Sequence, residues 1–148
     1  MKILLALDES PCSEAALAAV VRQFPPSESD VRVLHVDDWP RGLPVSAAFA
    51  EGPAAASSIL AAHDELRRRG EGILSRAERC LKTARFRVET EMRQGDVRDA
   101  ILNCAETWHP DVIVVGSHGR RGLKRLVLGS VSDGVVRQAT CSVEVVRA

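Results

Sequence analysis

Short apolar runs alternate with longer amphipathic segments along this chain, and the two patterns predict different elements. Apolar or alternating runs bounded by turn residues are typical of strands, whereas apolar residues that recur about every 3.6 positions are typical of helices. The run at 2–8 is continuously apolar, which indicates a strand buried on both faces. The run at 86–92 alternates apolar with charged residues, so we expect a strand with one solvated face at a sheet edge. The predicted strands cover residues 2–8, 31–36, 86–92, 111–115 and 142–146.

Helix signals fill most of the gaps between the predicted strands. Ser10 and the proline after it supply an N-cap and a first-turn proline, and the helix that they begin ends near Phe24, before two prolines. A second helix is predicted from about 59 to 83 by one apolar stripe between charged faces, with Gly70 and Gly72 weakening its middle. The remaining helices are expected between Gly95-Asp96 and His109-Pro110, and from about 130 to 139.

The stretch between the second strand and the second helix differs in composition from the rest of the chain. Residues 37–58 are rich in Pro, Gly, Ala and Ser and show no convincing helix or strand period. We therefore expect a long, mobile loop at about 38–58.

Five strands that alternate with four helices predict an α/β fold. A parallel βαβ crossover is right-handed and places its helix on a face of the sheet. We therefore expect a single-domain, doubly wound five-stranded parallel sheet over residues 1–148. Ligands of such sheets bind beyond the carboxyl ends of the strands, where the winding reverses. Asp8 and Gly116 both end predicted strands, so they are expected to meet at this edge.

A glycine pattern after the fourth predicted strand is the strongest chemical signal. Gly116 and Gly119 are followed, after nine residues, by Gly129-Ser130 at the start of the last predicted helix. Glycines let backbone N–H groups approach a phosphate closely, and the first amides of a helix lack intrahelical partners. The pattern therefore predicts a nucleotide site. The same loop contains four cations that could balance a polyphosphate, namely Arg120, Arg121, Lys124 and Arg125.

Composition limits the partners of such a site. The chain has 20 basic and 20 acidic residues, so its formal net charge is zero, and it has three Phe, two Trp and no Tyr. A general polyanion binder needs a basic surface, and single-stranded nucleic acid is usually bound on aromatic stacking platforms. Nucleic acid is therefore not an expected partner.

Location and metal chemistry can also be predicted from simple features. The first apolar run, Ile3–Leu7, is too short for a signal-peptide core or a membrane span. The four cysteines are widely spaced and form neither a Cys-x-x-Cys pair nor a metal-type cluster. We expect a cytoplasmic protein with no membrane partner and no metal ion held by protein side chains.

Five short segments spread along the chain form a recognisable set: Ile3–Ser10, Leu34–Val36, Gly95-Asp96, Val115–Gly119 and Leu128–Ser132. Through these segments the chain resembles the universal stress protein family over nearly its whole length. The spacing Gly-x2-Gly-x9-Gly-Ser/Thr marks the ATP-binding branch of that family and is intact here. The resemblance implies an adenine nucleotide alpha hydrolase-like fold with the sheet order 3-2-1-4-5, and an ATP molecule between strands 1 and 4.

The resemblance also implies roles for individual residues. Ala6 and Val36 would lie along the adenine, with backbone groups reading its edge, and Asp8 would accept hydrogen bonds from the ribose. Val115 and Gly116 would support the adenine and the ribose. Mg²⁺ or Mn²⁺ would accompany ATP, bound through its phosphates. The phosphates themselves would be held by Gly119, Gly129, Ser130 and Val131.

The end of the chain departs from the family pattern. Family members usually have a proline before the last strand, where this chain has Ser142, and Glu144 within the strand is also unusual. In family members that resemble this one, the last strand pairs with its copy in a second subunit, and an exposed edge strand suits such pairing. The resemblance thus implies a homodimer through Val143 and Val145, which Ser142 and Glu144 leave possible.

Two classes of function fit these residues. A nucleotide-dependent binding module in stress responses is favoured, because the phosphate cradle comes without an evident base for the γ-phosphate and the Walker pattern is absent. The alternative is a slow ATPase or a self-phosphorylating enzyme that uses Ser130 or a neighbouring hydroxyl. A phospho-accepting receiver domain is excluded, because the third strand ends without an Asp acceptor.

Several residues also have plain structural interpretations. Asp8 could cap the first helix instead of binding ribose, and His118 could be a solvated turn residue. Cys12 lies in the first turn of a helix, where its pKa could be lowered and the thiol could sense oxidants, but a plain thiol is the favoured interpretation. Trp39 and Trp108 are expected to be structural, with Trp108 packing in the core.

Overall fold

The computed structural model describes residues 1–38, 52–119 and 128–148. The predicted order of strands and helices is confirmed over these residues, with shifted boundaries. The strands are β1 (Lys2–Ala6), β2 (Asp30–Asp37), β3 (Arg87–Gln94), β4 (Val112–Gly116) and β5 (Ser142–Val146). The helices are α1 (Pro11–Gln23), α3 (Pro53–Thr83), α4 (Val97–Trp108) and α5 (Ser130–Gln138), with a 3-10 turn, η1 (Pro26–Glu28).

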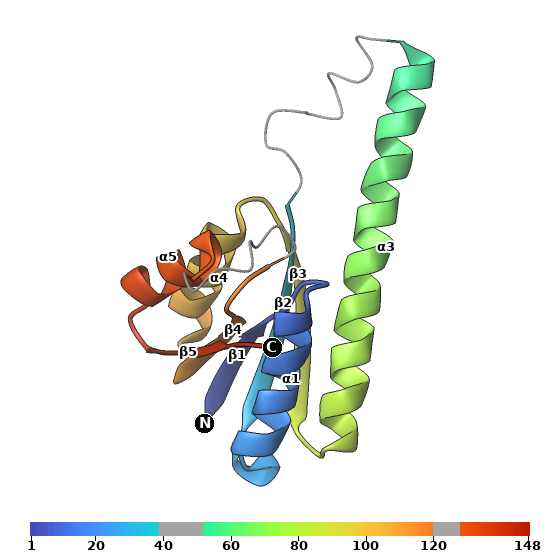
Figure 1. Cartoon of the computed structure of the whole chain (residues 1–148). Coiled ribbons are helices and arrows are strands. Elements are labelled where there is room, and N and C mark those ends of the chain that lie inside the picture. The colour runs from blue at the N-terminus through green and yellow to red at the C-terminus, as the bar shows by residue number, and fades with distance from the viewer. Residues whose placement is uncertain (39–51, 120–127) are drawn as a thin grey trace.

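The five strands form one parallel sheet in the order β3-β2-β1-β4-β5, as the resemblance implied. β1 lies at the centre of the sheet, so the winding reverses between β1 and β4. Helices α1 and α3 cover one face of the sheet, and α4 and α5 cover the other (Figure 1). The predicted doubly wound α/β sheet is therefore confirmed.

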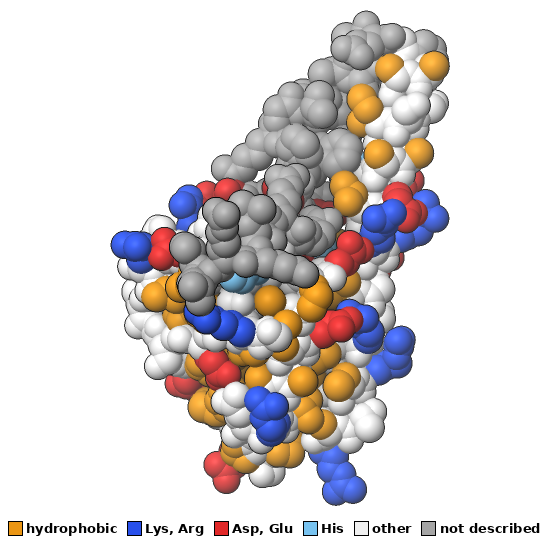
Figure 2. Space-filling model, in the orientation of Figure 1, with side chains coloured by type: hydrophobic (Ala, Val, Ile, Leu, Met, Phe, Trp, Pro, Cys, Tyr) orange, Lys and Arg blue, Asp and Glu red, His pale blue; other side chains and the backbone are white. Residues whose placement is uncertain are grey.

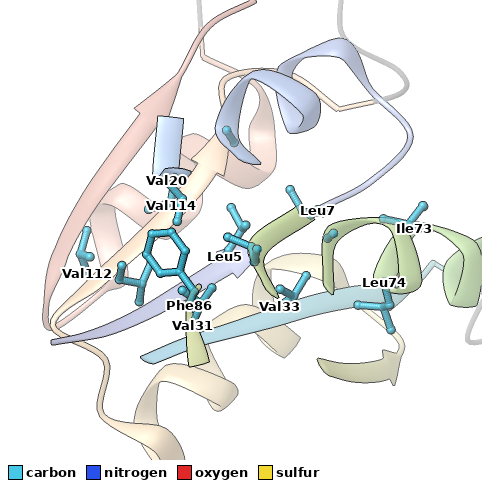
Figure 3. Close-up of a cluster of buried hydrophobic side chains, with 14 residues drawn as sticks. Leu5, Leu7, Val20, Val31, Val33, Ile73, Leu74, Phe86, Val112 and Val114 are labelled. Atoms are coloured by element: carbon cyan, nitrogen blue, oxygen red, sulfur yellow. The ribbon is translucent and has the colours of Figure 1, made fainter. Parts of the chain in front are cut away.

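A hydrophobic cluster lies on each face of the sheet. The first cluster packs α1 and α3 against the strands (Figure 3), and the second packs α4 and α5 against the opposite face. Successive side chains of a strand point to opposite faces. Accordingly, Ile3 and Leu5 of β1 belong to the first cluster and Leu4 belongs to the second. This double burial explains why the first apolar run is continuous.

Helix α3 is longer than predicted. It begins at Pro53 rather than near residue 59, so the part of the predicted loop from 53 to 58 is helical. A proline in the first turn and the three alanines after it favour a helix start, but the Pro, Gly, Ala and Ser composition obscured this signal. The start of α3 extends beyond the sheet (Figure 1), and hydrophobic side chains line its visible surface (Figure 2), with Leu60 41% exposed. Residues 39–51 of the predicted loop, including Trp39, lie outside the described residues.

Gly70 has a packing role that the sequence did not reveal. A methyl group at this position would lie 2.5 Å from Cδ2 of His35 and 2.9 Å from Cε of Met92. Helix α3 therefore approaches β2 and β3 closely because position 70 has no side chain. The side chain of the buried His35 also contacts the end of β1, because its Nδ1 lies 2.8 Å from the carbonyl oxygen of Leu7.

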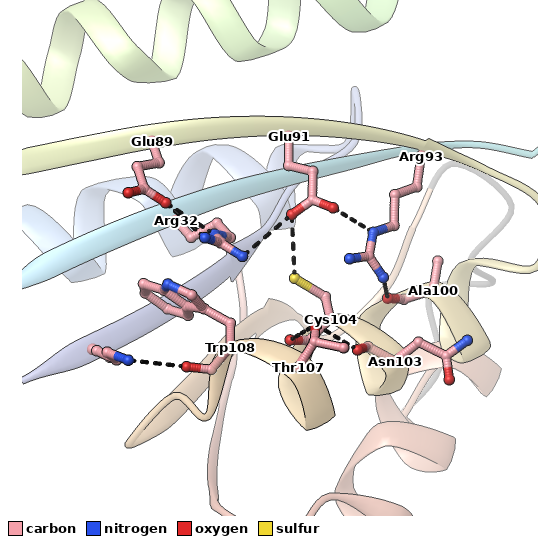
Figure 4. Close-up of polar contacts among 10 residues, drawn as sticks. Arg32, Glu89, Glu91, Arg93, Ala100, Asn103, Cys104, Thr107 and Trp108 are labelled. Carbon is pink, nitrogen blue, oxygen red and sulfur yellow. Dashed lines mark hydrogen bonds and ion pairs between the residues drawn. The ribbon is translucent and has the colours of Figure 1, made fainter.

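Strand β3 is an edge strand, as predicted, but its charged face is not simply solvated. Arg32 of β2 forms ion pairs with Glu89 and Glu91 (Figure 4), and Arg93 pairs with Glu91. The thiol of Cys104, from α4, donates to Glu91 Oε2 at 3.6 Å. The charges of β3 thus form a polar contact with β2 and α4.

Trp108 packs against the second hydrophobic cluster, as predicted. The guanidinium of Arg32 lies 4.6 Å from the centroid of its ring, and Nζ of Lys2 lies 5.5 Å from it. Both are cation–π distances. Trp108 therefore joins the end of α4 to β1 and β2 (Figure 4).

Candidate functional site

Asp8 lies just beyond β1 and is fixed by the first turn of α1. Its Oδ1 accepts hydrogen bonds from the backbone N–H of Ser10 at 3.0 Å and from the hydroxyl of Ser13 at 2.6 Å. The backbone N–H of Asp8 donates to Ser13 Oγ at 2.9 Å. Ser10 is the N-cap of α1, as predicted, and its hydroxyl accepts from the backbone N–H of Ser13. One carboxylate oxygen of Asp8 therefore has structural partners in the turn before α1, although the residue that caps the helix is Ser10.

The other carboxylate oxygen of Asp8 faces Gly119. A methyl group at position 119 would lie 2.9 Å from Asp8 Oδ2. The two residues follow neighbouring strands, since Ala6 of β1 is in register with Val115 of β4. Asp8 and Gly116 were expected to meet at this edge, but the glycine that Asp8 faces is Gly119, and Gly116 faces the first turn of α1 instead. Gly119 leaves the carboxylate oxygen room that a side chain would occupy.

Gly116 contacts a helix at this edge. A methyl group at position 116 would lie 2.8 Å from Cβ of Cys12 and 3.1 Å from the backbone nitrogen of Ser13. Position 116 therefore lets the first turn of α1 pack against the end of β4. This contact explains the glycine without a ligand, and its support of an adenine and ribose stays a prediction.

The two ends of the loop between β4 and α5 are tied together. The backbone N–H of Gly129 donates to the carbonyl oxygen of Ser117 at 2.8 Å, and the hydroxyl of Ser132 donates to the same oxygen at 3.0 Å. Ser117 also donates its own N–H to the carbonyl oxygen of Val146 at 2.7 Å. Ser117 and Ser132 are 1% and 2% exposed. Sequence reasoning assigned them no role, although both lie inside the motifs that indicated the family.

The start of α5 presents its first residues at the same edge. Its N-cap is Gly129, which has no side chain to cap the first amide groups. Ser130 is the first helical residue and is exposed, whereas Val131 is partly buried against the second cluster. An uncapped helix start that follows a glycine is suited to bind an anion.

The three apolar residues assigned to the adenine lie on the α4 and α5 side of the sheet. Val36 and Val115 are buried in the second cluster, and Ala6 is partly buried against it. All three lie in the last part of their strands, β2, β4 and β1. Two of the three side chains are therefore part of the core. The contact of Ala6, Val36 and Val115 with adenine stays a prediction.

Cys12 connects the first turn of α1 to the loop after β4. Its Sγ lies 3.5 Å from the hydroxyl oxygen of Ser117, which in turn lies 3.1 Å from Nδ1 of His118. The hydrogen bond from Ser117 lowers the pKa of the Cys12 thiol below its ordinary value. A lowered pKa was considered from the helix position, but a neighbouring hydroxyl is its main cause. By contrast, burial raises the pKa of Cys104 and Cys141.

Part of the predicted site lies outside the described residues, namely the loop cations Arg120, Arg121, Lys124 and Arg125. Within residues 1–38, 52–119 and 128–148, no three His, Cys, Asp or Glu side chains lie close enough to hold a metal ion together. In the same ranges, no helix combines the length and the apolar character needed to cross a membrane.

Known proteins share this fold and are similar to this chain in sequence. The model of the universal stress protein family matches residues 1–147. Universal stress protein YxiE of Bacillus subtilis is 33% identical over 148 residues, which are 99% of this chain and 98% of that protein. The solved structure of MJ0577 from Methanocaldococcus jannaschii has a TM-score of 0.81 and 26% identity, and covers 99% of this chain and 95% of its own.

More distant solved structures have the same fold and contain adenine nucleotides. The Arabidopsis thaliana protein At3g01520, with AMP bound, has a TM-score of 0.70 and 18% identity over 99% of this chain and 91% of its own. A universal stress protein in complex with cAMP and one from Archaeoglobus fulgidus in complex with dAMP have TM-scores of 0.63 and 0.68. On the match of the family model and the likeness to YxiE, this chain belongs to the universal stress protein family.

Proposed function

We propose that this protein binds ATP at the carboxyl edge of β1 and β4 and acts in the cytoplasm as a nucleotide-dependent module of stress responses. One observation carries the proposal: Asp8 Oδ2 faces the space that a side chain at position 119 would occupy. This pairing lies at the switch point of the sheet, where ligands of doubly wound folds bind. The AMP, cAMP and dAMP held by structural neighbours support an adenine nucleotide as the ligand.

Within this proposal, different parts of the nucleotide contact the connection from β1 to α1 and the connection from β4 to α5. Asp8 accepts hydrogen bonds from the ribose hydroxyls, and the adenine lies along Ala6, Val36 and Val115, next to Gly116. The phosphates lie at the start of α5, where N–H groups after a glycine favour an anion. We propose ATP as the ligand because the Gly-x2-Gly-x9-Gly-Ser spacing that marks the ATP-binding branch of the family is intact. The residues proposed to hold the phosphates are Gly119, Gly129, Ser130 and Val131.

A divalent cation enters the proposal through the ligand. Mg²⁺ or Mn²⁺ commonly binds phosphate oxygens and water, with few protein ligands. Among the described residues, the start of α5 offers backbone amides and the hydroxyl of Ser130, which suit phosphate better than a metal ion, while the carboxylate of Asp133 in the same turn is paired with Arg137. The protein would therefore bind the cation through the nucleotide.

We further propose a homodimer through β5. β5 is the edge strand of the sheet beside β4, so within the described part of the chain one side of its backbone has no neighbouring strand. Val143 and Val145 turn toward the second cluster, and Glu144 accepts a hydrogen bond from Gln23 of α1 at 3.0 Å. These side chains therefore point to the faces of the sheet and leave its edge accessible. Light scattering of the purified protein should give about twice the 16.0 kDa mass of the chain.

The test of nucleotide binding uses the protein as purified. Mass spectrometry identifies any adenine nucleotide that co-purifies, and calorimetry with ATP and Mg²⁺ measures its affinity. Gly119→Val should abolish binding, because its side chain would fill the space beside Asp8, while circular dichroism and the melting temperature stay close to those of the wild type. Gly72→Ala is the control, since a methyl group there has no atom within 4 Å. Unchanged ATP affinity in Gly119→Val would refute the site.

Measurements of ATP turnover distinguish the enzymatic alternative from the binding module. Phosphate release or self-phosphorylation well above the spontaneous rate, and lost in Ser130→Ala, would replace the binding-module proposal with an enzyme. Binding without turnover would support the module. Both measurements use the same protein and the same nucleotide.

A further inference from the structure

Helix α5 contains a glycine in its interior, at position 134, where glycine is less favourable than alanine. A methyl group at this position would lie 2.6 Å from Cδ of Arg98 and 3.3 Å from its Cγ. Gly134 is buried, and the aliphatic part of Arg98 lies directly against it. The absence of a side chain at position 134 therefore makes room for the side chain of Arg98 from α4.

Arg98 lies at the same edge of the sheet as the start of α5. All five strands are parallel, so the helices that follow them begin at their carboxyl ends. Arg98 is the second residue of α4, and α4 and α5 lie side by side (Figure 1). Gly134 follows Ser130 by four positions, on the same face of α5 and about 6 Å along its axis. Nε of Arg98 would lie 3.9 Å from a methyl group at position 134, so the guanidinium begins beside Gly134, which is about one helical turn from Ser130 along α5.

The guanidinium of Arg98 is held by a neighbour that a phosphate could displace. Its Nε and Nη2 donate to Oδ1 of Asp99 at 3.1 and 2.9 Å. The two side chains are 43% and 41% exposed, and an ion pair this exposed contributes little to stability. A terminal phosphate offers more charge and more acceptor oxygens than one carboxylate. Asp133, the acidic residue in the first turn of α5, is itself paired with Arg137 at 2.9 Å.

We propose that Arg98 is a phosphate-binding residue that makes this site prefer ATP to AMP. When a polyphosphate occupies the start of α5, the guanidinium leaves Asp99 and binds the β- or γ-phosphate, with Gly134 providing the path of the side chain. No covalent bond changes. The inference rests on the proposed function, since it needs a nucleotide at this edge, and it assigns the selectivity to a residue outside the glycine motif.

Calorimetry with ATP and with AMP, each with Mg²⁺, tests this role. Arg98→Gln removes the charge but keeps a polar side chain, and should weaken ATP about tenfold while AMP affinity stays unchanged. Arg98→Lys keeps the charge without the planar fork, so it should give an intermediate ATP affinity. Selective loss of the longer nucleotide is the result that a merely structural arginine would not give.

Two further variants test the contact of Arg98 with Gly134 and its ion pair with Asp99. Gly134→Ala should weaken ATP but not AMP, because its methyl group displaces the side chain of Arg98, although alanine favours the helix. Asp99→Asn should strengthen ATP about two- to fivefold, because it removes the partner that competes with phosphate. Its backbone N–H bond to the N-cap Asp96 at 3.0 Å is unaffected by the change.

The outcomes separate this inference from the proposed function. If the wild type binds no adenine nucleotide, the proposed function fails and the role of Arg98 fails with it. If the wild type binds ATP and Arg98→Gln weakens ATP and AMP equally, or neither, only the inference is overturned. Should Arg98→Gln fold poorly, Gly134→Ala and Asp99→Asn decide: opposite effects on ATP support the inference, and any other pattern overturns it.

Discussion

The two crossovers that meet at the carboxyl edge of the sheet begin their helices in different ways. After β1, the chain enters α1 through side chains: Ser10 caps the helix, and Ser13 and Asp8 hydrogen-bond each other. After β4, the chain enters α5 through a glycine, and the ties that hold this loop run to backbone oxygens of Ser117 and Gly129. We call these the α1 junction (residues 7–13) and the α5 junction (residues 117–119 and 128–132).

This difference indicates which part of a ligand each junction would contact. The α1 junction already satisfies its helix start with its own hydroxyls and offers a fixed carboxylate oxygen, which suits the hydroxyl groups of a ribose. The α5 junction has no side-chain cap at Gly129, so an anion can serve as the cap. Variants at the α1 junction should therefore affect every adenine nucleotide, and variants at the α5 junction should affect the phosphate-rich ones.

The largest effect is expected where the two crossovers touch, at Gly116. Gly116→Ala places a methyl group 2.8 Å from Cys12 Cβ and 2.9 Å from its carbonyl carbon. Because backbone of α1 must shift, we expect the free energy of unfolding to fall by about 2–3 kcal/mol. Urea denaturation measures it, with Gly72→Ala as control, which should be neutral or more stable by up to about 1 kcal/mol. A Gly116→Ala protein as stable as the wild type would show that the crossovers are not packed against each other.

A smaller effect is expected from Ser13→Ala, which breaks the α1 junction alone. The hydroxyl exchanges two hydrogen bonds with Asp8, one of them to a carboxylate, so its loss should cost about 2 kcal/mol. ATP and AMP should weaken by the same factor, because the ribose is common to both. Ser75→Ala, an exposed helix position, is the matched control and should change stability by less than about 0.5 kcal/mol. Weakening of ATP alone would contradict the division between the junctions.

The order of elements and the sheet could be predicted from the sequence because their signals are local. The alternation of strand and helix patterns gave the parallel fold, and the caps at Ser10 and Asp96 mark helix starts where they were expected. The start of α3 at Pro53 was missed, because an alanine-rich helix start resembles a loop in composition. A single-residue boundary such as the end of β1 at Ala6 also depends on the pairing of strands, which no local signal shows.

The site was predicted less completely, because glycines with different partners look alike in a sequence. Gly119 faces Asp8, whereas Gly116 faces the helix α1 and Gly134 accommodates Arg98. Which of these applies depends on the neighbouring element, and that is set by the tertiary packing. The buried hydroxyls of Ser117 and Ser132 lie within the recognised motifs, but their hydrogen bonds to the loop ends became visible in the structure.

Ser132→Ala tests the α5 junction with a weaker perturbation. It removes the hydroxyl that donates to the carbonyl oxygens of Ser117 and Gly129, at 3.0 and 2.9 Å. Stability should fall by about 1 kcal/mol, as for a neutral hydrogen bond, since the Gly129 N–H still binds Ser117. ATP should weaken more than AMP in calorimetry. An equal loss of ATP and AMP affinity would mean that both junctions contact the part of the ligand that the two nucleotides share.

The smallest effect is expected at Cys12, the thiol through which the α1 junction contacts the α5 junction. The hydroxyl of Ser117 lowers the pKa of Cys12, so Ser117→Ala should raise that pKa. A higher pKa leaves less thiolate near neutral pH, and the thiolate is the reactive form. Alkylation of Cys12, followed by mass spectrometry, should therefore be slower in the variant near neutral pH and equal to the wild type at alkaline pH. The exposed Cys80 serves as the internal reference in both proteins. Because the hydroxyl reaches the thiol across the two junctions, an unchanged pH profile would mean that the junctions do not communicate through this contact.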